Sequence, residues 1–156
     1  MNMYDTVLVL HSIFKWLVLL ALSVSVLKSY LGYGNDHIFN SLSNGLRHWT
    51  ATIAHIQLVL GIVLYSKSPV IKYFWNNFDE ASENLSSTFF GLIHIILMLL
   101  AIIIITIGSA KAKREQLDKD KFKTMALWFT VGLLIIFIAI PWPFSPLANR
   151  PYVRTF

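Results

Sequence analysis

Four apolar stretches constrain the fold of this chain more than any other feature of its sequence. They span about residues 6–31, 46–65, 87–110 and 122–140, and each is about 19 to 26 residues long. At about 1.5 Å per helical residue, about 20 residues cross the ~30 Å hydrocarbon layer of a bilayer. The stretches show no alternation of period two, and each is about twice as long as a barrel strand needs to be. The sequence therefore predicts an all-α membrane protein, a single domain over residues 1–156 folded as an up-down-up-down bundle of four transmembrane helices.

Composition supports the membrane assignment and narrows the chemistry. Apolar residues make up 56% of the chain and charged residues only 13%, about half the share usual in soluble domains. The absence of cysteine excludes disulfides, iron–sulfur clusters and covalent attachment of a c-type haem. Most of the net charge of +5 comes from the loop at residues 111–123, which has six basic and three acidic residues. Lipid headgroups, and not nucleic acid, are the expected partner of this loop.

The distribution of Lys and Arg predicts the orientation in the membrane. The first and third connections together hold eight of these residues, and the opposite side holds four. Both termini are therefore expected in the periplasm, with the chain in a bacterial inner membrane. No Lys or Arg precedes the first apolar stretch and no small-x-small cleavage site follows it, so this helix is expected to be retained. The connection at residues 67–84 is expected to be a loop, with Pro69 ending the second helix.

A helix can cross a membrane without any histidine, so the five histidines of this chain call for another explanation. His37 lies in a predicted loop, whereas His11, His48, His55 and His94 fall within or at the edge of predicted helices. Ionisable groups inside a membrane cost free energy and usually mark a site. Counted from the predicted outer boundaries, His11 lies about 8 Å deep and His94 about 10 Å deep. Their levels match, whereas His55 lies near the middle of the second helix and His48 near its inner end.

Two imidazoles at one depth on different helices are suited to ligate the iron of a b-type haem from opposite sides. His11 and His94 are the preferred ligands, and His55 is the substitute for either. Lys15 lies one helical turn from His11 on the same face. Lys15 and Arg47 are candidates for binding a haem propionate or a quinone oxygen.

Several short motifs along the chain together resemble a known family. They are His11-Ser12 with Lys15-Trp16; Ala54-His55-Ile56-Gln57-Leu58 with Gly61 and Leu64-Tyr65; His94 with Met98 and Ala101; the run from Thr106 to Arg114; Pro141-Trp142-Pro143-Phe144; and Arg150-Pro151. In combination they resemble small bacterial four-helix integral membrane proteins labelled cytochrome-b-like, and the resemblance covers nearly the whole chain. It implies haem at the histidine positions of that family, which His11, His55 and His94 match. Lys15 stands where Arg is more usual, which leaves a charged role intact but weakens a bidentate one.

The leading functional hypothesis is a haem b membrane protein that passes electrons between a quinone pool and a partner. It would act as a homo-oligomer or as a subunit of a larger membrane complex, because four such helices contain no evident catalytic site. One alternative is a non-enzymatic accessory or structural subunit whose histidines bridge helices by hydrogen bonds. Another is a small protein that handles metal or haem. The chain has no H-E-x-x-H motif, no P-loop and no Asp or Glu inside the four stretches, which argues against a zinc hydrolase, a nucleotide-binding enzyme and a carboxylate-driven pump.

Overall fold

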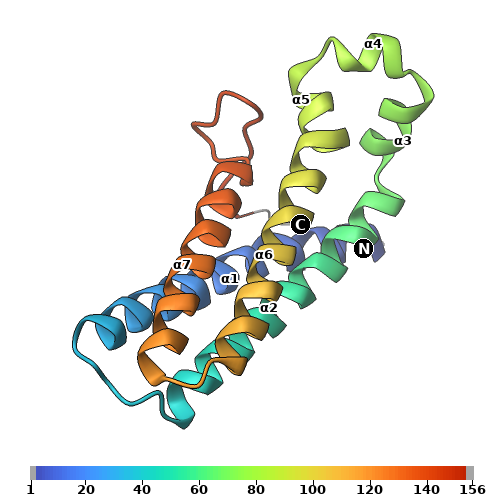
Figure 1. Cartoon of the computed structure of the whole chain (residues 1–156). Helices are drawn as coiled ribbons and strands as arrows, with labels where there is room; N and C mark the ends of the chain where they lie inside the picture. The colour runs from blue at the N-terminus through green and yellow to red at the C-terminus, as the bar shows by residue number, and fades with distance from the viewer. Residues whose placement is uncertain (1–2, 154–156) are drawn as a thin grey trace.

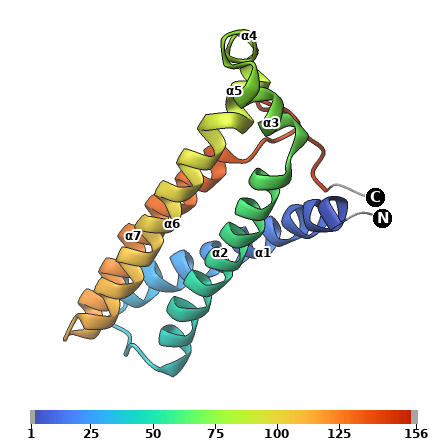
Figure 2. The same ribbon diagram turned by 90° about the vertical axis from the view of Figure 1, so that its right-hand side faces the viewer.

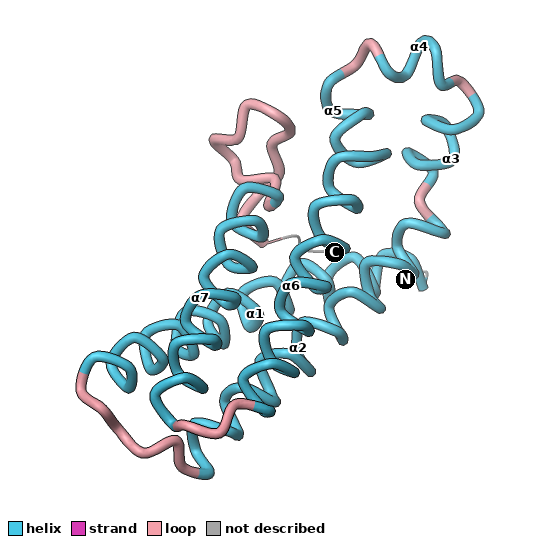
Figure 3. The backbone as a smooth tube through the Cα atoms, in the orientation of Figure 1, coloured by secondary structure: helices cyan, strands magenta, loops and turns pink. Residues whose placement is uncertain are grey.

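The computed structural model describes residues 3–153, and within that range the chain is almost entirely helical and contains no strand (Figures 1 and 3). In chain order the elements are α1 (Met3–Gly34), α2 (Ser41–Lys67), α3 (Pro69–Asn76), α4 (Phe78–Ser82), α5 (Leu85–Thr88), the π-helix η1 (Phe89–Ile93), α6 (His94–Arg114) and α7 (Asp118–Ala139). Because α5, η1 and α6 run on as one apolar span, four helices are long and apolar enough to cross a membrane. The chain is a multi-pass membrane protein with an all-α, four-helix fold, as predicted.

Each long helix packs against two others. α1 contacts α2 and α7, and α6 contacts the same two helices. Figures 1 and 2 show α2, α6 and α7 running roughly alongside one another, while α1 lies obliquely across them. The core between them is filled by fully buried side chains such as Leu22, Ile105 and Phe129.

The outer surface of the bundle is strongly apolar. Leu20 and Leu27 of α1 are each 61% exposed, and Leu134 of α7 is 57% exposed. Such side chains lie favourably against the acyl chains of lipid. Because lipid is as apolar as these side chains, the hydrophobic effect does not drive the helices to associate. Close packing at small residues takes over that role, and Gly108 and Gly132 allow α6 and α7 to approach each other.

The connection between the second and third spans differs from the prediction, because most of residues 67–84 are helical. The Ser68 hydroxyl caps α3 by accepting a hydrogen bond from the backbone N–H of Ile71 (3.4 Å), and Pro69 occupies the start of α3. Proline is favoured there, since its missing N–H would have no helical partner at that position. Pro69 therefore ends α2 and also begins the next helix. The connection folds over one end of the α5–α6 span, at the top of Figure 1, and brings Phe74 against Gly91.

Candidate functional site

A cavity of about 270 Å³ lies between the N-terminal half of α1, the C-terminal half of α2, the start of α6 and the end of α7. Pockets that bind small molecules usually measure about 300–1,000 Å³, so this cavity is slightly smaller than that range. Leu58, Met98 and Ile136 contribute to its largely apolar wall. His11 and His94 both line it.

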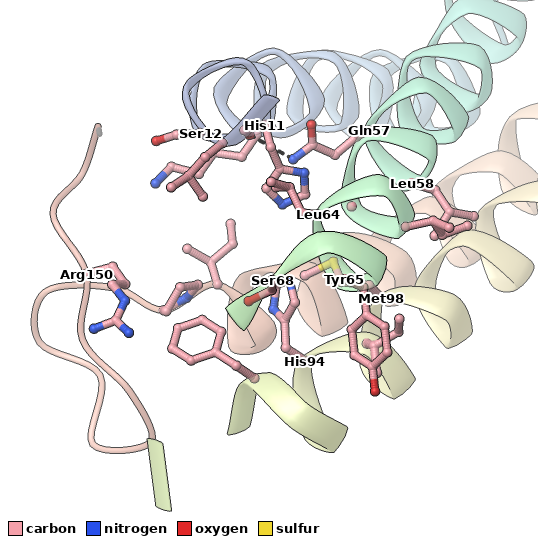
Figure 4. Close-up of a pocket in the computed structure, with 18 of the residues that line it drawn as sticks. His11, Ser12, Gln57, Leu58, Leu64, Tyr65, Ser68, His94, Met98 and Arg150 are labelled. Carbon is pink, nitrogen blue, oxygen red and sulfur yellow. Dashed lines mark hydrogen bonds between the residues drawn. The ribbon is translucent and has the colours of Figure 1, made fainter. Parts of the chain in front are cut away.

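His11 and His94 extend toward one another across this cavity (Figure 4). The centroids of their rings are 6.5 Å apart, and the ring planes are inclined by 73°. Two imidazoles on opposite sides of one metal ion have centroids about 6 Å apart, because each metal–nitrogen bond is about 2 Å and the nitrogen lies about 1 Å from the ring centre. The structure therefore brings together the two histidines that the depth estimate pairs, at a spacing that a shared metal would fit.

The hydrogen bond of His94 determines which of its nitrogens is available. Nδ1 lies 2.8 Å from the backbone oxygen of Ala139 at the end of α7. A carbonyl oxygen can only accept, so Nδ1 must carry the proton and donate it. In a neutral imidazole the lone pair is then on Nε2. Metal-bound histidines usually have their other nitrogen held by a carbonyl or carboxylate in this way.

His11 is positioned by contacts with α2. The side-chain amide of Gln57 donates to the backbone oxygen of His11 (3.0 Å), and Gly61 leaves room for the imidazole, since a Cβ there would lie 3.3 Å from its Cε1. Nδ1 of His11 and Oε1 of Gln57 are buried without a hydrogen-bond partner among the described residues. Buried polar atoms in native proteins are nearly always paired. Two orphaned atoms beside one cavity therefore indicate that a ligand or water completes the site.

A π-helix immediately precedes His94 and affects how its side chain is presented. η1 widens the helix over one turn, and such π-bulges occur frequently at functional sites. The Tyr65 hydroxyl donates to the backbone oxygen of Gly91 within η1 (2.7 Å) and accepts from Nε1 of Trp75 (2.9 Å). A Cβ at Gly91 would overlap the ring of Phe74. Glycine and tyrosine at these positions thus stabilise the local geometry that positions His94.

The remaining histidines lie away from the cavity. His55 is exposed on the outside of α2; its Nδ1 lies 2.7 Å from the backbone oxygen of Ala51, and its Nε2 lies 3.1 Å from the Thr106 hydroxyl oxygen. Both of its ring nitrogens are therefore engaged, one within α2 and one across to α6. His48 is exposed beside Trp49.

The two candidate cations are also separated. Lys15 lines the cavity that contains His11 and His94. Arg47 lies outside it, buried near the start of α2. Its guanidinium donates to the Asn44 side chain (2.9 and 3.0 Å) and, across to α6, to the Ser109 hydroxyl (2.7 Å) and backbone oxygen (3.1 Å). Arg47 thus fastens α2 to α6.

Substituting Arg47→Lys is expected to lower the free energy of unfolding by about 1–3 kcal/mol, because one ammonium cannot reproduce the forked contacts to Asn44 and Ser109. The measurement is unfolding in mixed detergent and dodecyl sulfate micelles, followed by circular dichroism. The exposed swap Lys123→Arg serves as the control, with an expected change within about 0.5 kcal/mol. Equal stability of the two variants would contradict the fastening role of Arg47.

Three residues contribute to the site in ways that the sequence alone does not predict. The Ala139 carbonyl carries no signal, because every residue has one. Tyr65 stands in an ordinary apolar stretch, and only its position beside Gly91 in the structure reveals its contact. Arg150 lines the cavity from the segment after α7, where no helical periodicity predicts its direction.

Comparisons with protein-family models, with curated proteins and with solved structures find no match. The function of this chain is therefore inferred from its own geometry. Among residues 3–153, no three His, Cys, Asp or Glu side chains are grouped so that they could hold a metal ion by themselves. The cavity offers two imidazoles, so a metal held between them would need its other ligands from a bound group such as a haem.

Proposed function

We propose that this chain is a membrane protein that binds one b-type haem between His11 and His94 and passes electrons within the bilayer. The observation that carries the proposal is the pair of imidazoles facing one another at 6.5 Å across an apolar cavity. The Ala139 carbonyl supports it further, because it leaves the lone pair of His94 on Nε2. Haem bound without thioether links is also consistent with a chain that has no cysteine.

The residues of the cavity would contribute binding, orientation and exclusion of water, and the haem would supply one-electron chemistry. Ile102 and Ile136 form part of a wall of low dielectric constant, and Met98 adds an adaptable side chain to it. Nδ1 of His11 and Oε1 of Gln57, which are buried without a hydrogen-bond partner among the described residues, would bond to water or to a group of the ligand. The polar side chains that line the cavity include Gln57 and Ser12 beside the two imidazoles.

The physiological setting follows from the same proposal. A quinone pool in the bilayer and a redox partner on the outer side would exchange electrons through the haem. The excess of Lys and Arg on the side of residues 111–123 favours a bacterial cytoplasmic membrane with both termini periplasmic. A homo-oligomer or a larger membrane complex is the proposed assembly.

The second candidate is a structural subunit without a cofactor. The hydrogen bond from His94 to α7 and that between His55 and α6 favour it, because each histidine already bridges two helices. The two candidates differ in the unpartnered Nδ1 of His11. A structural role alone leaves that atom without a hydrogen-bond partner, whereas a site that takes up water or a ligand could supply one.

Detergent-purified protein provides the test of the proposed function. We expect a Soret band, and sharp, split α and β bands in the spectrum of dithionite-reduced minus ferricyanide-oxidised protein, because two axial imidazoles favour a six-coordinate low-spin iron. A pyridine haemochrome assay should give one haem b per chain. A colourless, well-folded protein that also fails to take up added haemin would exclude the proposal and favour the structural subunit.

A further inference from the structure

The imidazole of His11 lies with one edge against the backbone of α2. A Cβ added to Gly61 would lie 3.3 Å from Cε1 and 3.8 Å from Nδ1 of His11, whereas Nε2 would lie beyond 4 Å. The edge formed by Nδ1 and Cε1 therefore faces Gly61, and Nε2 lies farther from it. Carbon atoms in favourable contact are about 3.5–4.0 Å apart. The ring can thus lie this close to α2 because residue 61 has no side chain.

Gln57 brings acceptor oxygens to the same part of α2. It precedes Gly61 by four residues, so the two share one face of the helix. Its side-chain amide donates to the backbone oxygen of His11 (3.0 Å), and its own backbone oxygen interacts with the imidazole. Oε1 of Gln57 and Nδ1 of His11 are both buried, and neither has a complete hydrogen bond with a described residue. The Nδ1 edge thus lies beside acceptors, which can accept its hydrogen bond directly or through a water.

These contacts assign different roles to the two nitrogens of His11. A neutral imidazole has one N–H and one lone pair, and acceptors beside Nδ1 favour the proton there. The lone pair is then on Nε2, the nitrogen farther from Gly61. His94 has the same arrangement, because its Nδ1 lies 2.8 Å from the backbone oxygen of Ala139. Both imidazoles would therefore offer Nε2 to a metal, with Nδ1 facing an acceptor, as is usual for metal-bound histidines.

The two rings are held from different helices and at a steep angle. α2 contacts His11 and α7 holds His94, and the ring planes are inclined by 73°. Two imidazoles that bind one iron from opposite sides can have parallel or crossed planes, and the contacts that hold each ring decide between them. Here neither ring can turn without losing its contact, so the planes of the two ligands would remain crossed.

We infer that Gly61 is a positioning residue of the proposed haem site. Its missing side chain lets α2 hold the Nδ1 edge of His11, so that Nε2 of His11 meets the iron in a plane that crosses the plane of His94. The inference rests on the proposed function and adds to it the nitrogen of His11 that binds and the relative orientation of the two ligands. A glycine that served helix packing alone would affect neither.

The first test uses the natural protein without haem, in detergent and at mildly alkaline pH. Nitrogen-15 NMR of protein labelled at histidine distinguishes a protonated ring nitrogen from one with a lone pair, and the signals missing from His11→Gln protein identify those of His11. We expect the proton of His11 on Nδ1. A proton on Nε2 would overturn the inference whether or not the protein binds haem.

The second test uses haem-loaded, oxidised protein and electron paramagnetic resonance. Crossed imidazole planes give low-spin ferric iron a strongly anisotropic signal, whereas parallel planes give a rhombic one. We expect the anisotropic signal from the natural protein. In Gly61→Ala the added methyl group should displace His11 by a few tenths of an ångström, which should change this signal and weaken haem binding about 5- to 10-fold.

Gly45→Ala is the matched control, because Gly45 is also a glycine of α2 but no atom lies within 4 Å of an added Cβ. It should keep the signal and the affinity of the natural protein. A rhombic signal from the natural protein, or a Gly61→Ala protein with unchanged signal and affinity, would overturn the inference and leave the proposed function standing. A natural protein without a low-spin haem spectrum would instead remove the proposed function, and the inference with it. Neither measurement on the natural protein depends on how well a variant folds.

Discussion

Alanine in place of His94 is expected to abolish the sharp α and β bands of the reduced protein and to weaken haem binding by at least about 100-fold. Loss of a group that merely orients a metal ligand already costs about 10- to 100-fold in affinity, and this substitution removes a ligand itself. It also leaves the Ala139 oxygen without its donor. Optical titration with haemin and the reduced-minus-oxidised spectrum are the measurements.

His55→Ala is the matched control, because His55 is also a histidine of a membrane span but lies outside the cavity. This variant should lose its contact with Thr106 and keep the haem bands. Imidazole added to His94→Gly protein should restore low-spin bands, which separates loss of ligation from loss of folding. Unchanged bands in His94→Ala, or their loss in His55→Ala alone, would contradict the assignment.

The sequence predicts the depth of these histidines better than their direction. Counting residues from the ends of the apolar stretches places His11 and His94 at one level, and the structure brings them together. The direction in which a histidine points around the helix axis depends on which helices lie next to its own. A helix that is apolar on all sides does not show which of its faces meets a neighbour. His55 precedes Gln57 by two residues, about 200° of helical rotation. The face of α2 that presents Gln57 to the cavity therefore turns His55 away from it.

Local backbone features were harder to predict than the spans. The four spans follow from length and apolarity, since nothing else covers about 30 Å of hydrocarbon with these residues. The π-helix before His94 depends on contacts of Tyr65 and Phe74, which approach Gly91 only in the folded chain. The helices α3 and α4 fall in the stretch predicted as a loop, because Pro69 was interpreted as a stop signal alone. The preceding serine, a good N-cap, was the signal that a new helix begins there.

Placement of the C-terminal segment has a similar cause. Its four prolines exclude a regular helix, so periodicity cannot show where Arg150 points. The contacts of Trp16 with Trp142 and Tyr152 determine its course. Tryptophans near a predicted membrane interface are expected as aromatic belts, and here they also attach a segment that lines the cavity.

The close approach of α6 and α7 makes Gly108→Ala the packing substitution with the largest expected effect. A Cβ at residue 108 would overlap the Cβ of Trp128, and that atom is fixed to the backbone of α7 and cannot rotate away. The helices must then separate, at an expected cost of about 1–3 kcal/mol in the free energy of unfolding. The same displacement would disturb the pairing of α6 with α7 that holds His94 near the Ala139 oxygen.

Alanine substitutions at two further glycines are expected to have smaller or opposite effects on the free energy of unfolding. At Gly132 the nearest atom to an added Cβ is Cγ1 of Ile105, at 2.6 Å, and that side chain can change rotamer, so Gly132→Ala should cost less than Gly108→Ala. Gly45 in α2 has no atom within 4 Å of an added Cβ, and alanine there should raise stability by about 0.5–1 kcal/mol by reducing the freedom of the unfolded chain. Dodecyl sulfate titration of the three variants in mixed micelles gives the order. Both Gly108→Ala and Gly45→Ala add one methyl group to a helix, and they differ only in what that methyl group contacts. Equal stability of the two variants would show that the contact between α6 and α7 at Gly108 does not hold the bundle together.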